Sequence, residues 1–177
     1  MAKRHSNAIK KIAIIGPECT GKTTLAQSLA QHFQTIWIPE YAREYVLNLN
    51  QPYNYNDVVH IAQKQKSQIC QEYELANRFV FFDTELIITK VWFDIVFKDK
   101  PEWIENAIAT SGFDMYLLCN TELIWEPDVV RENGGEMREK LFTIYENELK
   151  SRNFKYVIIN GIGNERFEKA VSYINNL

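Results

Sequence analysis

The chain has 177 residues, a formal net charge of −3 and a hydrophobic fraction of 46%, values typical of a globular domain rather than a disordered chain. The acidic balance disfavours a nucleic-acid surface, which needs clustered Lys and Arg, and no apolar run reaches the roughly 18–20 residues of a membrane span. Three cysteines without metal-ligand spacing (Cys19, Cys70 and Cys119) and an N-terminus without an apolar signal segment predict reduced thiols in a cytoplasmic protein.

Five short apolar or β-branched runs follow one another along the chain, and each leads into a polar turn. Continuous rather than alternating apolar residues are typical of strands that are buried on both faces of a parallel sheet. The predicted strands are residues 11–15, 35–38, 79–82, 115–119 and 156–159.

Helical patterns separate these strands, and alternating strands and helices predict a doubly wound α/β sheet with right-handed crossovers. In such folds ligands bind beyond the carboxyl ends of the strands. We expect one domain over residues 1–177, with residues 1–10 as a mobile tail; the sequence indicates no oligomeric state. The predicted helices are residues 24–30, 56–76 and 136–151, one that begins at Pro101 and one that begins near Asn164.

The first strand leads into Gly-Pro-Glu-Cys-Thr-Gly-Lys-Thr at residues 16–23, a complete G-x-x-x-x-G-K-[ST] phosphate-binding pattern with the strand before it and the helix after it that this pattern requires. Its glycines let backbone N–H groups wrap a phosphate, and the helix N-terminus adds partial positive charge. We expect Lys22 to bridge the β- and γ-phosphates and the Thr23 hydroxyl to hold Mg²⁺. The chain is therefore predicted to bind a nucleoside triphosphate through Gly16, Glu18, Cys19, Thr20, Gly21, Lys22, Thr23 and Thr24.

The third strand ends in Asp83, directly after four large apolar residues. A carboxylate in this place, beside a phosphate loop, is typical of the group that holds Mg²⁺. The alternative is that Asp83 only caps the helix that follows it. We expect a metal role for Asp83 together with Thr23, and the two roles can coexist.

The second strand ends in Pro39-Glu40-Tyr41-Ala42-Arg43-Glu44-Tyr45. If a helix follows Pro39, Glu40 and Arg43 share one of its faces. A carboxylate opposite the phosphate loop could deprotonate or orient an attacking hydroxyl, and Arg43 could steady the acceptor. The alternative is a first-turn glutamate favoured by the helix dipole.

Residues 125–138, between the fourth and fifth strands, hold Arg131 and Arg138 on either side of a Gly-Gly pair. Arginines on a mobile segment can close over a transferring phosphoryl group, neutralise its charge and exclude water. We expect a lid here; a solvated surface turn followed by a helix is the alternative. Two further glycines, Gly161 and Gly163, follow the last strand. They either let the backbone approach a purine base closely or form an ordinary tight turn.

Taken together, residues 16–25, 39–45 and 82–85 and the segment that holds Asp128 and Arg131 resemble the ribosylnicotinamide kinase domain of NadR-type proteins, a family of P-loop kinases. The resemblance implies a sheet of order 2-3-1-4-5, ATP and Mg²⁺ as donor and cofactor, and the ribose 5′-hydroxyl of nicotinamide riboside as acceptor. It implies catalytic roles for Lys22, Glu40, Asp83, Arg131 and Arg138, and acceptor contacts for Glu40, Tyr41, Arg43, Asp83 and Asp128.

Two features depart from the family pattern. Family members often carry an adenylyltransferase or a DNA-binding domain before the kinase. The 177 residues leave room for neither, so we expect a stand-alone kinase module here. The lid has Asp128-Val129-Val130-Arg131 where Asp-Gly-x-Arg is expected, so the spacing is kept without the flexible glycine.

Two other functions stay open from the sequence. The first is a kinase of another nucleoside or of a nucleoside monophosphate, which needs a further Arg or Lys cluster for the acceptor phosphate. The second is an ATP-dependent switch without a small acceptor. A GTPase is disfavoured because Cys119-Asn120-Thr121-Glu122 does not match the Asn-Lys-x-Asp motif.

Overall fold

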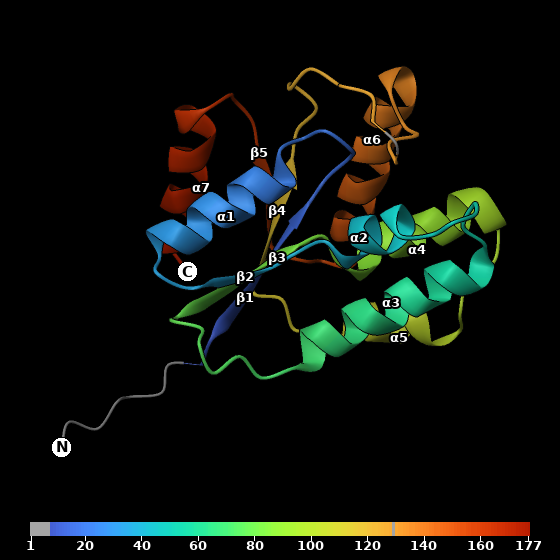
Figure 1. The fold of residues 1–177 in the computed structure, drawn as a ribbon. Coiled ribbons are helices and arrows are strands. Elements are labelled where there is room, and N and C mark those ends of the chain that lie inside the picture. Colours follow the sequence, from blue (N-terminus) through green and yellow to red (C-terminus); the bar gives the residue numbers. More distant parts are fainter. Residues whose placement is uncertain (1–7, 129) are drawn as a thin grey trace.

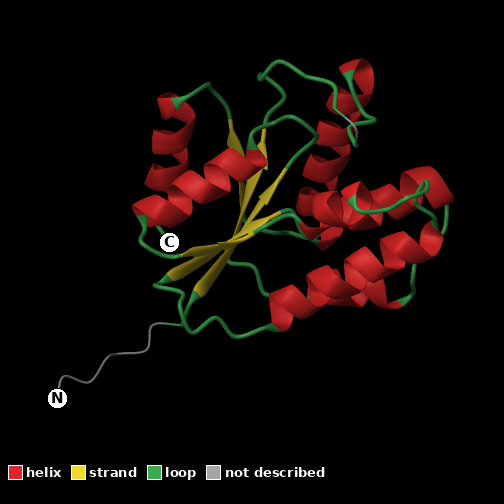
Figure 2. Ribbon diagram, viewed as in Figure 1, coloured by secondary structure: helices red, strands yellow, loops and turns green. Residues whose placement is uncertain are grey.

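A five-stranded parallel sheet lies at the centre of the fold (Figure 2). The structure is a computed structural model that describes residues 8–128 and 130–177. The strand order is β2-β3-β1-β4-β5, which confirms the order that the family resemblance implied. The strands are β1 (Lys10–Ile15), β2 (Ile36–Ile38), β3 (Phe79–Asp83), β4 (Met115–Cys119) and β5 (Tyr156–Ile159).

The central strands are buried on both faces, which explains their continuous apolar runs. In β1, Ala13 and Ile15 face one hydrophobic cluster while Ile12 and Ile14 face the other. The same alternation holds in β3 and β4, so each strand supplies both cores.

Helices cover the two faces unequally (Figure 1). Helices α1 (Lys22–His32) and α7 (Asn164–Asn175) pack on one face beneath the smaller cluster. The larger cluster lies under α3 (Tyr55–Cys70), α4 (Leu86–Trp92), the π-helix η1 (Phe93–Phe97), α5 (Trp103–Ala109) and α6 (Gly135–Ser151), and the short α2 (Tyr41–Leu47) packs beside α3.

Several predicted boundaries were wrong. The helix expected from Asn56 to Ala76 is capped two residues earlier, because Asn54 and Asp57 form a reciprocal capping box, and it ends at Cys70. Lys10, expected in the mobile tail, is the first residue of β1 and pairs with Phe79. The rest of that expectation, for residues 1–7, lies outside the described residues.

The sequence analysis missed α4 and η1. Residues 86–97 are mostly apolar on every side because α4 packs against α3, α5 and α6, so they show no amphipathic period. Over residues 8–128 and 130–177, no helix is both long enough and apolar enough to span a membrane.

Candidate active site

A cavity of about 680 Å³ opens where β1, β2 and β3 end. Gly16, Glu40 and Thr84 line it, and each lies within two residues of the last residue of one of these strands. The phosphate loop lies on one side, and α2, η1 and residues 130–133 complete the walls. The predicted loop, Glu40, Arg43 and Arg131 therefore meet in one hollow, as expected from strand ends that share an edge of the sheet.

The first glycine of the phosphate loop is required by close packing as well as by conformation. Gly16 has φ 146°, a backbone angle that side chains rarely adopt. A Cβ atom there would lie 2.7 Å from the carbonyl oxygen of Cys119 on β4. The loop can thus sit close against the sheet before α1 begins at Lys22, after Gly21 in the left-handed conformation.

Thr23 and Asp83 form the pair that the sequence predicted for a metal. The Thr23 hydroxyl donates a hydrogen bond of 2.6 Å to Asp83 Oδ2. Asp83 Oδ1 is buried and has no hydrogen-bond partner among the described residues. Burial raises the pKa of Asp83, while Lys22 and the Thr23 hydrogen bond oppose that rise. Helix α4 is capped instead by the Glu85 side chain, which accepts from the Ile87 N–H, so Asp83 is free of the alternative capping role.

This pair fits a magnesium ion. Mg²⁺ prefers one or two protein oxygens together with substrate phosphates, rather than a cage made only of protein ligands. In the part of the chain that the structure describes, no group of three or more His, Cys, Asp or Glu side chains could hold a metal alone. Thr23 and the unpartnered oxygen of Asp83 would hold Mg²⁺ beside the nucleotide phosphates.

Glu40 faces the phosphate loop, as the sequence predicted. It precedes α2 without capping it through its side chain, so its carboxylate is not bound to the helix end. Burial raises its pKa, and the nearby Lys22 opposes this rise while Asp83 reinforces it. A carboxyl group with a raised pKa in a cavity is typical of a proton acceptor.

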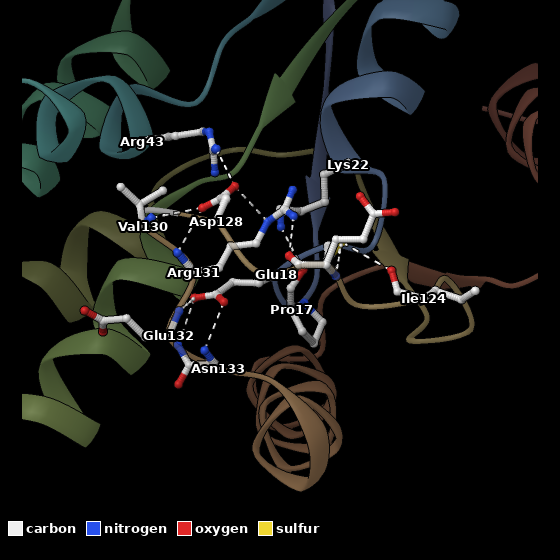
Figure 3. A network of polar contacts seen from close by, with 12 residues as sticks. Pro17, Glu18, Lys22, Arg43, Ile124, Asp128, Val130, Arg131, Glu132 and Asn133 are labelled. Atoms are coloured by element: carbon white, nitrogen blue, oxygen red, sulfur yellow. Dashed lines mark hydrogen bonds and ion pairs between the residues drawn. The ribbon is translucent and has the colours of Figure 1, made fainter.

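Arg43 and Arg131 are brought together by Asp128 (Figure 3). Asp128 Oδ2 lies 2.6 Å from Arg43 Nη2 and 3.1 Å from Arg131 Nε. Arg131 Nη1 also donates to the carbonyl of Glu126 at 2.5 Å. Burial would raise the pKa of Asp128, but the Val130 N–H and the Arg43 guanidinium together hold it below its ordinary value.

Glu18 ties the phosphate loop to the predicted lid. Its carboxylate accepts hydrogen bonds from the N–H of Glu132 at 3.3 Å and from the N–H and side-chain amide of Asn133 at 3.0 and 2.9 Å (Figure 3). Cys19 Sγ adds contacts of 3.4 Å to the carbonyl of Ile124 and the N–H of Glu126. The lid is thus fastened to loop residues that we had expected to contact nucleotide.

The predicted lid of residues 125–138 is two structures rather than one. Residues 135–138 are the first turn of α6, and only the preceding residues are irregular. Gly134 lies against the Trp125 ring, where a Cβ atom would come within 3.2 Å of ring carbons. Val129, in the middle of the predicted lid, lies outside the described residues.

Two predicted site residues do not reach the cavity as expected. Tyr41 hydrogen-bonds with His60 on α3 at 3.0 Å, because Tyr41 and Tyr45 share the face of α2 that packs against that helix. Arg138 is buried at 5% exposure on α6, and its guanidinium donates to carbonyl oxygens rather than facing the cavity. Tyr41 is therefore not placed to bind substrate, and Arg138 is not placed on a moving lid.

The sequence analysis missed the wall of the cavity that faces the phosphate loop. Tyr53, Trp92, Ile95 and Val96 line it, and the Tyr53 and Trp92 rings meet edge to face with centroids 4.8 Å apart. Ile95 and Val96 lie on the π-helix η1, a form common at functional sites, but nothing in the sequence predicts this helix.

Comparison with known proteins places this geometry in a family. A family model described as an AAA domain matches residues 11–166. The trifunctional NAD biosynthesis/regulator proteins NadR of Salmonella typhimurium and Escherichia coli are 26% and 27% identical to the chain, over 96% and 84% of its length. These matches cover 43% and 38% of the two relatives, so the chain spans less than half of their length. The predicted resemblance to a NadR-type domain is confirmed.

Solved structures show the same fold. A NadR protein in complex with NR has a TM-score of 0.80 at 23% identity, over 95% of this chain and 49% of that one. Thymidylate kinase from Ehrlichia chaffeensis has a TM-score of 0.68 at 11% identity, over 94% and 99% of the two chains. Deoxyadenosine kinase from M. mycoides has a TM-score of 0.64 at 15% identity, over 94% and 98%. The chain therefore has the fold of P-loop kinases.

Proposed function

We propose that this chain, which belongs to the AAA-domain family of P-loop proteins, is a nucleoside kinase that transfers the γ-phosphoryl group of ATP to the ribose 5′-hydroxyl of nicotinamide riboside. The observation that carries the proposal is the cavity itself. The phosphate loop, Glu40 and the aromatic side chains Tyr53 and Trp92 line it together, and the cations among its described lining residues are Lys22, Arg43 and Arg131.

The donor side needs little covalent chemistry from the protein. Phosphoryl transfer depends mainly on positioning and on fixed positive charge. The loop backbone and Lys22 would hold the phosphates, and Thr23 and Asp83 would hold Mg²⁺. Mg²⁺, when bound with ATP, supplies charge that neutralises the β- and γ-phosphate oxygens. Arg43 and Arg131 line the same cavity, where both are paired with Asp128.

Glu40 is the proposed acceptor of the hydroxyl proton. Burial raises its pKa, which makes it a stronger base than an ordinary glutamate, and the nearby Lys22 opposes that rise. Asp83 is less suited to this role because its Oδ2 is already bonded to the Thr23 hydroxyl. Asp83 is thus the proposed metal ligand and Glu40 the proposed proton acceptor.

The far wall favours a nucleoside over a nucleoside monophosphate. The cations among the described lining residues are Lys22, Arg43 and Arg131, and Asp128 holds both arginines. An acceptor phosphate would need an unpaired cationic cluster, whereas the wall offers Tyr53 and Trp92. The Tyr53 hydroxyl donates to Glu132 at 3.0 Å, which adds negative charge nearby. Aromatic faces beside a carboxylate suit the cationic pyridinium ring of nicotinamide riboside.

A coupled ADP-release assay tests the proposal. Purified protein with ATP and Mg²⁺ is offered nicotinamide riboside, nicotinic acid riboside, the common nucleosides and their monophosphates. We expect the highest kcat/KM with nicotinamide riboside. Preference for a monophosphate would contradict the acceptor class, and ADP release that is indifferent to every acceptor would favour the switch-type ATPase.

A further inference from the structure

Four successive carbonyl groups of the phosphate loop each accept a hydrogen bond from a side chain. The Pro17 carbonyl accepts from the Thr20 hydroxyl at 2.8 Å and from Lys22 Nζ at 2.9 Å. The next three accept from two arginines that lie outside the loop. Arg138 donates to the carbonyls of Glu18 and Cys19 at 3.1 and 2.8 Å, and Arg166 donates to the carbonyl of Thr20.

The two arginines reach the loop from opposite faces of the sheet. Arg138 comes from the first turn of α6 and Arg166 from the first turn of α7, and these helices belong to different hydrophobic clusters. Each arginine is only 5% exposed. Arg138 also donates to the carbonyl of Leu123 at 2.7 Å, so it joins the loop to the start of the lid.

The two buried guanidinium charges have no ionic partner in residues 8–128 and 130–177. Among the described residues, no carboxylate lies within 4.0 Å of either guanidinium, although nine such ion pairs occur elsewhere. Two nitrogens of Arg166, Nε and Nη1, are buried without a hydrogen-bond partner among the described residues. Burying a charge without an ionic partner is costly, so such residues are retained where an anion or another function offsets the cost.

We infer that Arg138 and Arg166 are positioning residues that preform the phosphate loop for an anion. A loop whose carbonyls are held from outside can turn its N–H groups inward only, which is the arrangement that binds phosphate. Carbonyl dipoles balance the two guanidinium charges only in part, and the triphosphate completes the balance. The inference rests on the proposed nucleotide site and assigns its affinity partly to residues that do not touch the nucleotide.

A purely structural role of Arg138 and Arg166 predicts a different result. If the arginines only fasten α6 and α7 to the sheet, replacing them lowers stability and leaves the affinity of the folded protein for phosphate unchanged. If they preform the loop, affinity falls in protein that is still folded. Arg152 is a matched control, because it is half-buried but paired with Glu148 and Glu105 at 2.9 and 2.6 Å, far from the loop.

Isothermal titration calorimetry distinguishes a structural role of the two arginines from a role in preforming the loop. The probes are inorganic triphosphate, which reports on the loop without a base, and Mg²⁺ with AMP-PNP. Variants are Arg138→Met, Arg138→Lys, Arg166→Met, Arg166→Lys and the control Arg152→Met, each checked by thermal melting monitored by circular dichroism. We expect Kd for both probes to rise at least tenfold in the Met variants and less in the Lys variants. Arg152→Met should lower Tm and leave Kd unchanged.

Folded Arg138 and Arg166 variants that bind both probes like the wild type would overturn the inference. If a Met variant does not fold at the assay temperature, the Lys variant decides, because it keeps the charge and loses the planar fork that spans adjacent carbonyls. Wild-type protein that binds neither probe would overturn the nucleotide site and this inference with it.

Discussion

Buried cations at the two ends of α6 have different kinds of partner. Near its C-terminus, Glu148 lies 2.6 Å from Lys90 and 2.9 Å from Arg152, and Asp94 pairs with Lys90 at 2.8 Å. At its N-terminus, Arg138 donates to three carbonyl oxygens and has no carboxylate partner among the described residues. The first network is complete without a ligand, whereas the second leaves positive charge that an anion can use.

The pKa directions follow the same division. Burial alone would lower the pKa of Lys90, but Asp94 and Glu148 hold it above the ordinary value. At the phosphate loop, burial raises the pKa of Asp83 and of Glu40, and Lys22 does not reverse either rise. Among the described residues, Lys22 lies within 4.0 Å of neither carboxylate, so its charge stays available to a phosphate.

The largest expected effect comes from removing the loop cation. Lys22→Ala should lower the rate of ADP formation by about a thousandfold or more, because fixed charge on the transferring group is a dominant catalytic term. Lys22 contacts the loop carbonyl of Pro17 and no carboxylate within 4.0 Å among the described residues, so the fold should survive. Initial rates and a thermal melt measure both. The control is Lys150→Ala, which removes only a surface pair with Glu146; an unfolded Lys22 variant would assign Lys22 a structural role.

Glu40→Gln keeps the size of the side chain and removes its charge. We expect turnover with nicotinamide riboside to fall by about two to four powers of ten, the usual range for general acid–base groups. The Kd for ATP should hardly change, because Glu40 precedes α2 and is not part of the phosphate loop. Glu44→Gln, an exposed change on the same helix, is the control. Near-normal turnover would return Glu40 to the role of a first-turn helix residue.

A smaller effect is expected where the lid meets the loop. Glu18→Ala removes the acceptor of three hydrogen bonds from Glu132 and Asn133. Hydrogen bonds to a charged group contribute about 1.5–3 kcal/mol each when buried and less when exposed, so we expect kcat to fall by about tenfold. Limited proteolysis should cut residues 126–134 faster in this variant than in Glu136→Ala, which changes an exposed glutamate on α6. Equal cleavage of the two variants would remove Glu18 as the anchor of the lid.

The smallest effect is on stability and involves Glu85, which lies near the ion pairs that Glu148 makes with Lys90 and Arg152. Burial raises the pKa of Glu85 to about 8, despite the opposing hydrogen bond from the Ile87 N–H. The folded state then binds this proton more tightly than the unfolded state, so the free energy of unfolding falls as pH rises from about 4.5 through 8.

Glu85→Gln keeps the oxygen that accepts from Ile87 and removes the titration. It should flatten the pH dependence by about 1 kcal/mol or more, since one pKa unit corresponds to about 1.4 kcal/mol. Urea unfolding between pH 5 and 8 measures this, with exposed Glu139→Gln as control. An unchanged slope in Glu85→Gln would place the titration elsewhere.

The sequence predicted the sheet and the loop because both depend on local patterns. Buried parallel strands require continuous apolar runs, and a phosphate loop requires glycines at fixed spacing. Asp83 and Glu40 were found because each lies at or just after the end of a strand, and the carboxyl ends of parallel strands share one edge. The strand order itself came from the family resemblance and was then confirmed.

The sequence failed where a side chain's direction depends on packing between distant elements. Arg138 fits a lid by position, but burial of α6 turns its guanidinium to loop carbonyls about 120 residues earlier in the chain. Arg166 gave no signal, because nothing near Gly163 reveals that the first turn of α7 meets Thr20. Tyr41 sits beside Glu40 in sequence, yet the helix periodicity sends the two side chains to different neighbours.

The central claim is that ATP and nicotinamide riboside meet in this cavity and exchange a phosphoryl group. The most direct measurement is phosphorus NMR of the purified protein with ATP, Mg²⁺ and nicotinamide riboside, with Lys22→Ala in parallel. The account predicts ADP and a new phosphomonoester at the ribose 5′ carbon in equal amounts, from the wild type and not from the variant. ADP accompanied by inorganic phosphate alone, or no ADP at all, would contradict it.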